Sequence, residues 1–169
     1  VAFRRIADEL PDARYEIFGD GPERARLEAE AGALGIADRI DWRGAAPYPQ
    51  ILEALRRCHL HLFTTIRSAT GRTEGVPNIL KETQAAGLPA VCFAHPGVDE
   101  VVEHGRTGLI VPQGDAPALA SAALRVLSDP ALATDLGSAA ETRARSLFDL
   151  AAITDRLEGI YRAAVDVDG

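Results

Sequence analysis

Short apolar runs alternate along the chain with longer stretches in which apolar residues recur at every third or fourth position. The second pattern predicts amphipathic helices, and a short apolar run bounded by Gly, Pro or Asp predicts a strand. The predicted strands cover residues 14–18, 40–43, 60–64, 90–93 and 109–111. The predicted helices cover residues 1–10, 23–34, 49–57, 77–86 and most of the chain from residue 115, with breaks at residues 129–130 and near residue 148.

This alternation of strands and helices predicts an α/β fold. Successive strands that are joined by helices run parallel, and the helices then cover both faces of the sheet. We therefore expect a Rossmann-like, three-layer parallel sheet. Ligands of such sheets bind beyond the carboxyl ends of the strands, so the Gly-rich and polar loops that follow the strands are where chemistry is expected.

Composition and charge narrow the class of protein. The chain has 169 residues, 47% of them hydrophobic and 25% charged, which is typical of one soluble globular domain. The net charge of −7 argues against a nucleic-acid-binding protein, which usually has a basic surface. No apolar run approaches the ~20 residues of a membrane-spanning helix, and no signal peptide is visible. Residues 1–6 already resemble the middle of an amphipathic helix, so we expect the sequence to begin inside a longer protein.

The Cys and His residues lack the spacing of a metal site. Cys58 and Cys92 are far apart in the sequence, and we expect two buried thiols in a reducing cytoplasm. His59 and His61 would face the same side of a strand, but no third ligand stands out, and we interpret them as packing residues. We therefore expect no metal and no cofactor.

The most informative pattern lies in residues 72–82. Two carboxylates, Glu74 and Glu82, lie on either side of a predicted helix start near Pro77. The unpaired N–H groups and positive dipole end of a helix start suit a diphosphate. Gly75 removes side-chain bulk where a ligand would approach. Glu82 would lie ~7.5 Å along the helix axis from Pro77, which is about the distance from a diphosphate to a ribose. A carboxylate can accept hydrogen bonds from the ribose hydroxyls.

The spacing by itself leaves a plainer interpretation open. Glutamate before a helix N-terminus is a common stabilising choice, and Glu82 is equally suited to a solvated helix face. A ligand site and an ordinary helix start therefore predict the same residues at these positions.

Residues 74–82 and the Ala-Ala-Gly-Leu-Pro run at 85–89 resemble the donor site of the family-4 retaining glycosyltransferases. These enzymes have two Rossmann-like domains, the GT-B architecture. Similar motifs follow and precede this stretch in the family's order, at residues 96–112, at residues 19–24 and in the closing helix up to Tyr161. The polar loop at residues 65–77 is similar to transferases of bacterial exopolysaccharide synthesis, of the colanic-acid kind.

The resemblance implies roles for the residues that match the family's motifs. Glu74 would contact the donor sugar as the catalytic residue, and Glu82 would bind the ribose. Apart from the resemblance, Arg72 is the cation expected to help neutralise the diphosphate, because it is the nearest to Glu74 in the sequence. Arg43 and Gly44 would meet the base through backbone groups, and Gly19 would line the same cleft. Backbone groups that hold the distal phosphate and sugar would come from Gly75, Val76, Pro77, Asn78 and Ile79.

The resemblance also implies what the chain does and what it lacks. Residues 1–169 would form one domain, the C-terminal, donor-binding half of a retaining transferase. That enzyme would move a hexose from a UDP- or GDP-linked sugar to a glycan or lipid-linked acceptor. The N-terminal acceptor domain, the first strand and an Arg–Lys pair that clamps the diphosphate would all precede Val1, so the chain alone is expected to be inactive. We expect a cytoplasmic location, peripheral to the inner membrane face through the missing domain, and no nucleic-acid partner.

Other functional classes remain open at this stage. A nucleotide-sugar epimerase would share the two-domain architecture but needs acid and base residues that the sequence does not identify. A dinucleotide-binding dehydrogenase domain would need a third glycine where this chain has Arg24, although Gly19 and Gly21 fit the first two positions. A regulatory or binding module without catalysis is a further alternative to a transferase.

Overall fold

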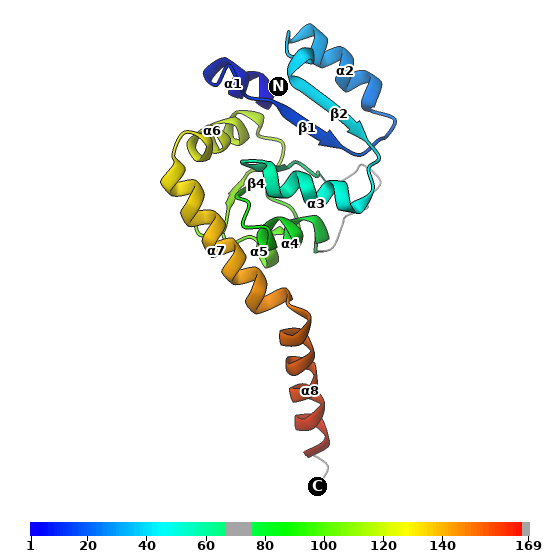
Figure 1. Ribbon diagram of the computed structural model, residues 1–169, viewed down its shortest axis with the longest axis vertical. Helices are drawn as coiled ribbons and strands as arrows, with labels where there is room; N and C mark the ends of the chain where they lie inside the picture. Colours follow the sequence, from blue (N-terminus) through cyan, green and yellow to red (C-terminus); the bar gives the residue numbers. More distant parts are fainter. Residues whose placement is uncertain (67–75, 167–169) are drawn as a thin grey trace.

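The computed structural model describes residues 1–66 and 76–166 of the chain (Figure 1). The elements in chain order are α1 (Ala2–Glu9), β1 (Tyr15–Phe18), α2 (Arg24–Ala33), the 3₁₀ turn Ala37–Arg39, β2 (Ile40–Gly44), α3 (Tyr48–Arg57), β3 (His61–Phe63), α4 (Asn78–Ala85), β4 (Ala90–Phe93), α5 (Val98–Val101), β5 (Leu109–Val111), α6 (Ala116–Leu127), α7 (Pro130–Phe148) and α8 (Leu150–Asp166). Every predicted strand and helix is present in the predicted order.

The differences from the sequence-based prediction lie at helix starts and in short helices. Pro77 is the N-cap of α4 and not its first-turn residue, and α3 begins at Tyr48, one residue before Pro49. The pattern missed α5 and the 3₁₀ turn because each is too short for a helical apolar period to develop. Prolines in the first turn of α6 and α7 mark those helix starts, and Asp115 and Asp129 cap them by accepting backbone N–H groups.

The expected α/β class with parallel strands is confirmed, but the described strands form two sheets. β1 pairs in parallel with β2, and Phe18 lies opposite Gly44 after a shift in register. β3, β4 and β5 form the second parallel sheet, with β4 in the centre. Figure 1 shows the β1–β2 pair set apart from the second sheet, so β1 and β3 are both edge strands.

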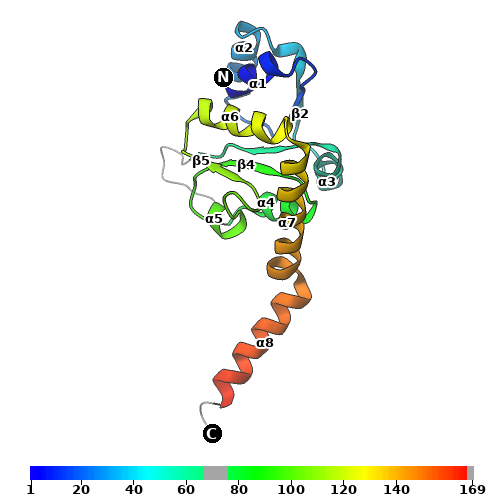
Figure 2. The ribbon, with the colours of Figure 1, turned by 90° about the vertical axis from the view of Figure 1, so that its left-hand side faces the viewer.

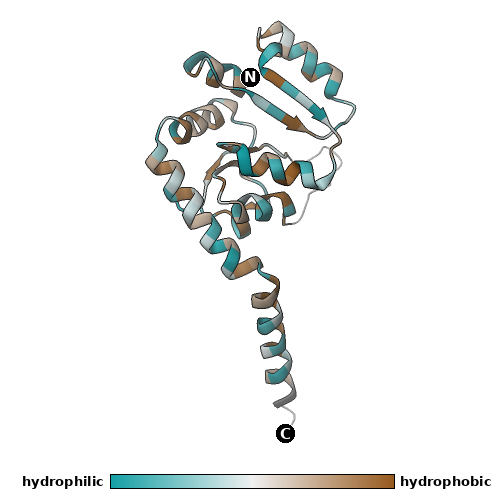
Figure 3. Cartoon of the chain, in the orientation of Figure 1, coloured by the Kyte–Doolittle hydropathy of each residue, from teal (hydrophilic) through white to brown (hydrophobic). Residues whose placement is uncertain are grey.

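The core forms around β4, all of whose residues are buried. Ala90 and Cys92 face one apolar cluster with Leu80 of α4. Val91 and Phe93 face the other cluster, which α6 and α7 complete. Helix α6 lies on one side of β4 and β5, and α4 and α5 lie on the other (Figure 2). β4 therefore has the continuous apolar sequence of a parallel strand covered on both faces, as the hydropathy colouring also indicates (Figure 3).

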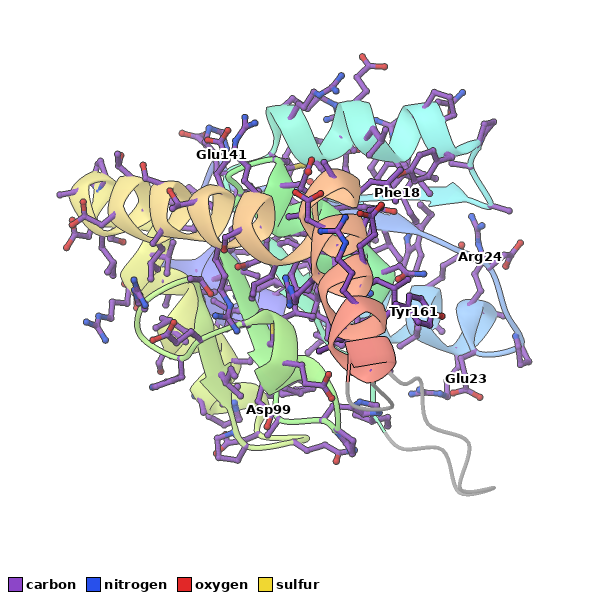
Figure 4. All side chains as sticks on the ribbon, turned by 90° about the horizontal axis from the view of Figure 1, so that it is seen from below. Phe18, Glu23, Arg24, Asp99, Glu141 and Tyr161 are labelled. Carbon is purple, nitrogen blue, oxygen red and sulfur yellow. The ribbon has the colours of Figure 1, made fainter. Side chains whose placement is uncertain are left out.

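Helix α8 extends away from this body and contacts α7 (Figures 1 and 2). Several of its large apolar side chains are exposed, including Tyr161 at 64% (Figure 4). Across residues 1–66 and 76–166, no helix combines the length and the hydropathy needed to cross a membrane.

Helix α7 approaches the backbone of the turn between α4 and β4 very closely. A Cβ added at Gly137 would lie 2.3 Å from the Gly87 carbonyl oxygen, well inside van der Waals contact. Gly87 itself has a φ of +65°, which a glycine adopts without strain. The α4·α7 packing therefore requires glycine at position 137.

We expect Gly137→Ala to lower the free energy of unfolding by about 1–3 kcal/mol, because backbone atoms must move apart to admit the methyl group. The control is Gly159→Ala in α8, where an added Cβ meets nothing within 4 Å. That change favours the helix by up to about 1 kcal/mol. Chemical denaturation measures both, and an equally stable Gly137→Ala protein would contradict the close approach.

Candidate functional site

The start of α4 presents backbone N–H groups at the carboxyl end of β3. Pro77 is a buried N-cap, and no side chain of the described residues caps the helix. The Leu80 N–H donates to the Pro77 carbonyl at 3.2 Å. The N–H groups of Asn78 and Ile79 precede that bond, so they have no intrahelical acceptor. This geometry is that of an anion site, which the helix dipole favours further.

Apolar packing holds this helix start in position. Leu80 is fully buried in the cluster that contains Phe63 and Val98. Val76 and Ile79 are partly buried against the same cluster. The side chains of Val76, Ile79 and Leu80 therefore pack toward the core, which leaves backbone groups at the helix start for a ligand.

Glu82 is joined to the start of α3. The Tyr48 hydroxyl donates to Glu82 Oε1 at 3.0 Å, and this bond raises the pKa of Tyr48. Tyr48 follows Gly44, the last residue of β2, by four positions. The bond thus brings the α4 carboxylate and the end of β2 to the same side of the molecule. Tyr48 could not be predicted from the sequence, because no periodicity or motif links two residues 34 positions apart.

Gly19 and Gly44 are brought together at the ends of the first two strands. The Gly19 N–H donates to the Gly44 carbonyl at 2.7 Å. Gly19 has a φ of +115° and Gly44 a φ of +63°, conformations that side chains other than glycine rarely adopt. Phe18, labelled in Figure 4, ends β1 immediately before this contact. The two glycines make a small turn surface that exposes backbone to a ligand.

The Arg43 side chain forms ion pairs with carboxylates. Its guanidinium lies 2.6 Å from Asp41 and 3.4 Å from Glu16. Glu16 is also paired with Arg57, and that pairing is the main reason why the pKa of Glu16 is lowered. The guanidinium of Arg43 therefore neutralises neighbouring acids, and the expected contact with a base is left to its backbone.

The Lys81 side chain also contacts neighbouring residues. Its ammonium group donates to Asn78 Oδ1 at 3.2 Å and lies 5.6 Å from the centre of the Phe148 ring. A cation over an aromatic face is attracted by the ring. Lys81 therefore supports the first turn of α4 from its side.

His95 is a buried polar residue close to the carboxyl end of β4. It follows β4, is 7% exposed, and lines a cavity of about 370 Å³ together with Asp99 of α5 (Figure 4). Its Nδ1 lies 2.9 Å from the Pro96 carbonyl oxygen, and its Nε2 has no hydrogen-bond partner among the described residues. An imidazole that donates from Nδ1 to the carbonyl has Nε2 as an acceptor, which suits a ligand hydroxyl.

Three of the predicted site residues lie outside the described residues. They are Arg72, Glu74 and Gly75. The structure brings Glu82 and Tyr48 into contact at one place and Gly19 and Gly44 at another. The predicted roles of all these residues stay predictions.

His61 is half-buried and hydrogen-bonded within the fold. Its Nδ1 lies 2.7 Å from Thr83 Oγ1, whose hydroxyl donates to the Ile79 carbonyl at 2.7 Å. Burial lowers the pKa of His61 to about 4. Residues 1–66 and 76–166 contain no group of three or more His, Cys, Asp or Glu side chains that could hold a metal ion.

Residues 1–143 match the protein family described as "Glycosyl transferases group 1". The chain is 36% identical over 140 residues to the exopolysaccharide phosphotransferase SCO2592 of Streptomyces coelicolor, covering 82% of this chain and 14% of that protein. It is 32% identical over 150 residues to the amylovoran biosynthesis glycosyltransferase AmsK of Erwinia amylovora, covering 85% and 37%. The chain thus spans well under half the length of these relatives.

Solved structures share the fold. The crystal structure of Anabaena Alr3699/HepE in complex with UDP superposes with a TM-score of 0.80 at 21% identity. The match covers 96% of this chain and 44% of that one. At this identity, the likeness establishes the fold alone.

We expect the free energy of unfolding to fall by about 2 kcal/mol as the pH falls from 6.5 to 4. In this range the unfolded chain, in which His61 has an ordinary pKa of ~6.5, binds a proton that the folded chain with its pKa of about 4 does not. Stability is therefore complete above pH ~6.5 and is lost toward pH ~4.

Urea denaturation at both pH values tests this expectation. His61→Gln should remove most of the difference, and His59→Gln, which changes an exposed neighbour, should retain it. An unchanged pH dependence in His61→Gln would assign the effect to other groups.

Proposed function

The chain belongs to the glycosyl transferases group 1 family, and we propose that residues 1–169 form the part of a retaining transferase that binds the nucleotide diphosphate sugar. The observation that carries the proposal is a helix start whose first N–H groups have no intrahelical acceptor, with a carboxylate one turn further along the same helix. Glu82 follows Asn78 by four residues, or ~6 Å along the axis.

Each part of a nucleoside diphosphate has a matching group in this arrangement. The N–H groups of Asn78 and Ile79 bind the distal phosphate, because they are donors without an intrahelical acceptor. Glu82 accepts hydrogen bonds from the two ribose hydroxyls. Its bond from Tyr48 uses one carboxylate oxygen, Oε1, and orients the group for the ribose.

The base lies toward the ends of β1 and β2. Gly19 and Gly44 expose backbone there, and Tyr48 connects that region to Glu82. Backbone N–H and C=O groups can hydrogen-bond the edge of a base without a dedicated side chain. The UDP named for the Anabaena HepE structure, which has the same fold, makes UDP the first nucleotide to test.

The reaction proposed for the whole protein is transfer of a hexose with retention at the anomeric carbon. The bond between that carbon and the diphosphate oxygen breaks, and the sugar forms a new bond to an acceptor hydroxyl, whose proton is released. The helix start, with Arg72, stabilises the negative charge that develops on the leaving diphosphate. Glu74 contacts the donor sugar. This chemistry uses no metal and no cofactor in the proposal.

The acceptor and the remaining catalytic groups belong to a part of the protein that this chain does not contain. Its relatives SCO2592 and AmsK are much longer, which supports an N-terminal acceptor domain preceding residue 1. Their names refer to exopolysaccharide and amylovoran. We infer a glycan or lipid-linked acceptor and a cytoplasmic location at the inner face of the membrane, with no nucleic acid involved.

The dehydrogenase alternative loses support at Arg24. A dinucleotide-binding turn needs a third glycine there so that the helix and strand can pack closely. Arg24 instead lies 5.9 Å from the Trp42 ring and bonds Glu28 at 2.8 Å (Figure 4). The family match likewise favours a transferase over an epimerase.

Calorimetric titration with UDP, GDP, ADP and NAD tests the assignment of Glu82. We expect one nucleoside diphosphate to bind, and Glu82→Ala to weaken it at least ~10-fold, because hydrogen bonds to a charged group contribute about 1.5–3 kcal/mol. The matched control is Glu53→Ala, an exposed carboxylate on α3. Binding of NAD alone, or full affinity in Glu82→Ala, would contradict the proposal.

Tyr48→Phe tests whether the bond to Glu82 orients the carboxylate. We expect a ~2- to 10-fold weaker Kd for the same nucleotide, the effect of one neutral hydrogen bond. Tyr161→Phe removes the hydroxyl of another exposed tyrosine, on α8, and should have no effect. Tighter binding in Tyr48→Phe would mean that the tyrosine competes with the ribose for Glu82.

A further inference from the structure

We propose that the cavity beyond the carboxyl end of β4 holds the hexose of the nucleotide diphosphate sugar, and that His95 accepts a hydrogen bond from one of its hydroxyl groups. The proposal rests on the proposed function and adds to it a place for the sugar within the described part of the chain. It makes His95 a residue that distinguishes the sugar nucleotide from the free nucleotide.

The His95 imidazole has one ring nitrogen in use and one to spare. Its Nδ1 lies 2.9 Å from the Pro96 carbonyl oxygen, which can only accept, so Nδ1 carries a proton. In the uncharged ring, Nε2 is then an acceptor. Nε2 is shielded from solvent and has no hydrogen-bond partner among residues 1–66 and 76–166. Because buried polar atoms nearly always have a partner, this acceptor is suited to a group that a ligand brings.

Backbone bonds on both sides hold His95 in place. The Ala94 N–H donates to the Val111 carbonyl at 2.7 Å, which continues the pairing of β4 with β5. The Val98 N–H donates to the His95 carbonyl at 3.1 Å and begins α5. The backbone of His95 is therefore fixed between a central strand and a helix, a setting that keeps the geometry of a binding group accurate.

The cavity beside His95 has the size and lining of a small-molecule site. Its volume of about 370 Å³ falls within the usual range of about 300–1,000 Å³. Its second polar side chain is Asp99, which Figure 4 labels on α5 and which is exposed to solvent. The rest of its lining comes from Ala94, Pro96, Val98 and Ile110.

The lining selects a ligand that donates hydrogen bonds. His95 Nε2 and the Asp99 carboxylate both accept, so a molecule that satisfies them must carry donors. A phosphate fits poorly, because it offers acceptors and meets a negative charge. A hexose has several hydroxyl donors and C–H faces that can lie against the apolar lining. The chemistry of the cavity therefore favours a sugar over the phosphates of the same ligand.

The cavity adjoins the start of α4, where the diphosphate is proposed to bind. Val98 lines the cavity and also belongs to the cluster against which Val76 and Ile79 pack. Helix α4 packs against both α3 and α5 (Figure 1). Tyr48 reaches Glu82 from α3, whereas the cavity lies against α5. The ribose, diphosphate and hexose of a nucleotide sugar thus have matching groups at α3 and Glu82, at the helix start and at the cavity.

Calorimetric titration of two ligands on one variant tests this assignment. The ligands are UDP and UDP-glucose, or GDP and GDP-mannose where GDP is the nucleotide bound. We expect His95→Phe to weaken binding of the sugar nucleotide ~3- to 10-fold and to leave the Kd of the free diphosphate unchanged, because the variant fills the same space but lacks the acceptor. His95→Gln, which offers an amide oxygen, should recover part of the loss.

The matched control is His59→Phe. His59 is an exposed histidine that does not line this cavity, so the change should alter neither Kd. A merely structural role of His95 would lower the affinity for both ligands together. The Tm of each variant shows whether its fold is intact.

Nitrogen-15 NMR of the imidazole gives a readout that needs no variant. In mildly alkaline buffer we expect the proton of His95 on Nδ1 and none on Nε2. The Nε2 signal should shift on addition of UDP-glucose and stay in place with UDP, because only the first supplies sugar hydroxyls. Methyl glucoside without nucleotide should leave the signal in place at the same concentration.

Four outcomes would overturn the proposal. A proton on Nε2 in the free protein would remove the acceptor. Equal losses for UDP and UDP-glucose in His95→Phe would assign the residue to the fold. An Nε2 shift with methyl glucoside alone would mean that the cavity receives an acceptor sugar. Unchanged affinity for UDP-glucose in His95→Phe would place the hexose elsewhere, with the proposed function intact. Binding of none of these nucleotides would count against the proposed function itself, and the hexose site would fall with it.

Discussion

The position of helix α4 depends on apolar packing and not on a cap. Leu80 is fully buried, and Val76 and Ile79 lie against the same cluster as Val98. These side chains fix the helix start from within, and no side chain of the described residues caps its first N–H groups. A polar cap at position 77 would satisfy one of those donors and reduce what is left for an anion. The buried proline holds the chain in place without doing so.

The rest of the molecule supports this helix from several directions. β4 lies beneath α4, and Gly137 lets α7 pack directly on the turn that follows the helix. Tyr48 of α3 contacts the exposed side of α4 through Glu82, and the Phe148 ring at the end of α7 lies 5.6 Å from the Lys81 ammonium group. A nucleotide that bridges the start of α4 and Glu82 would thus meet groups on one rigid element, which is the arrangement that keeps binding geometry accurate.

The sequence alone predicted the fold class and the order of the elements, because the apolar periods are strong and prolines and aspartates mark the starts of α6 and α7. It also predicted a helix start near Pro77 with Glu82 inside the helix. It could not predict the Tyr48–Glu82 bond or the Gly19–Gly44 contact, since each joins residues distant in the chain. Nor could residue types indicate that Arg43 is held by Asp41 and Glu16, because an exposed arginine near a loop is equally compatible with a ligand. The sequence also could not predict that the described strands form two sheets. The apolar pattern of a strand is the same whether or not a neighbouring strand pairs with it.

The central claim is that the backbone at the start of α4 binds the phosphates of a nucleotide. Amide NMR of the chain titrated in parallel with UDP and with uridine tests this most directly. We expect the Asn78 and Ile79 amide signals to shift with UDP and not with uridine, because only UDP supplies the anion. Shifts of equal size with both ligands, or UDP-induced shifts confined to other parts of the chain, would contradict it.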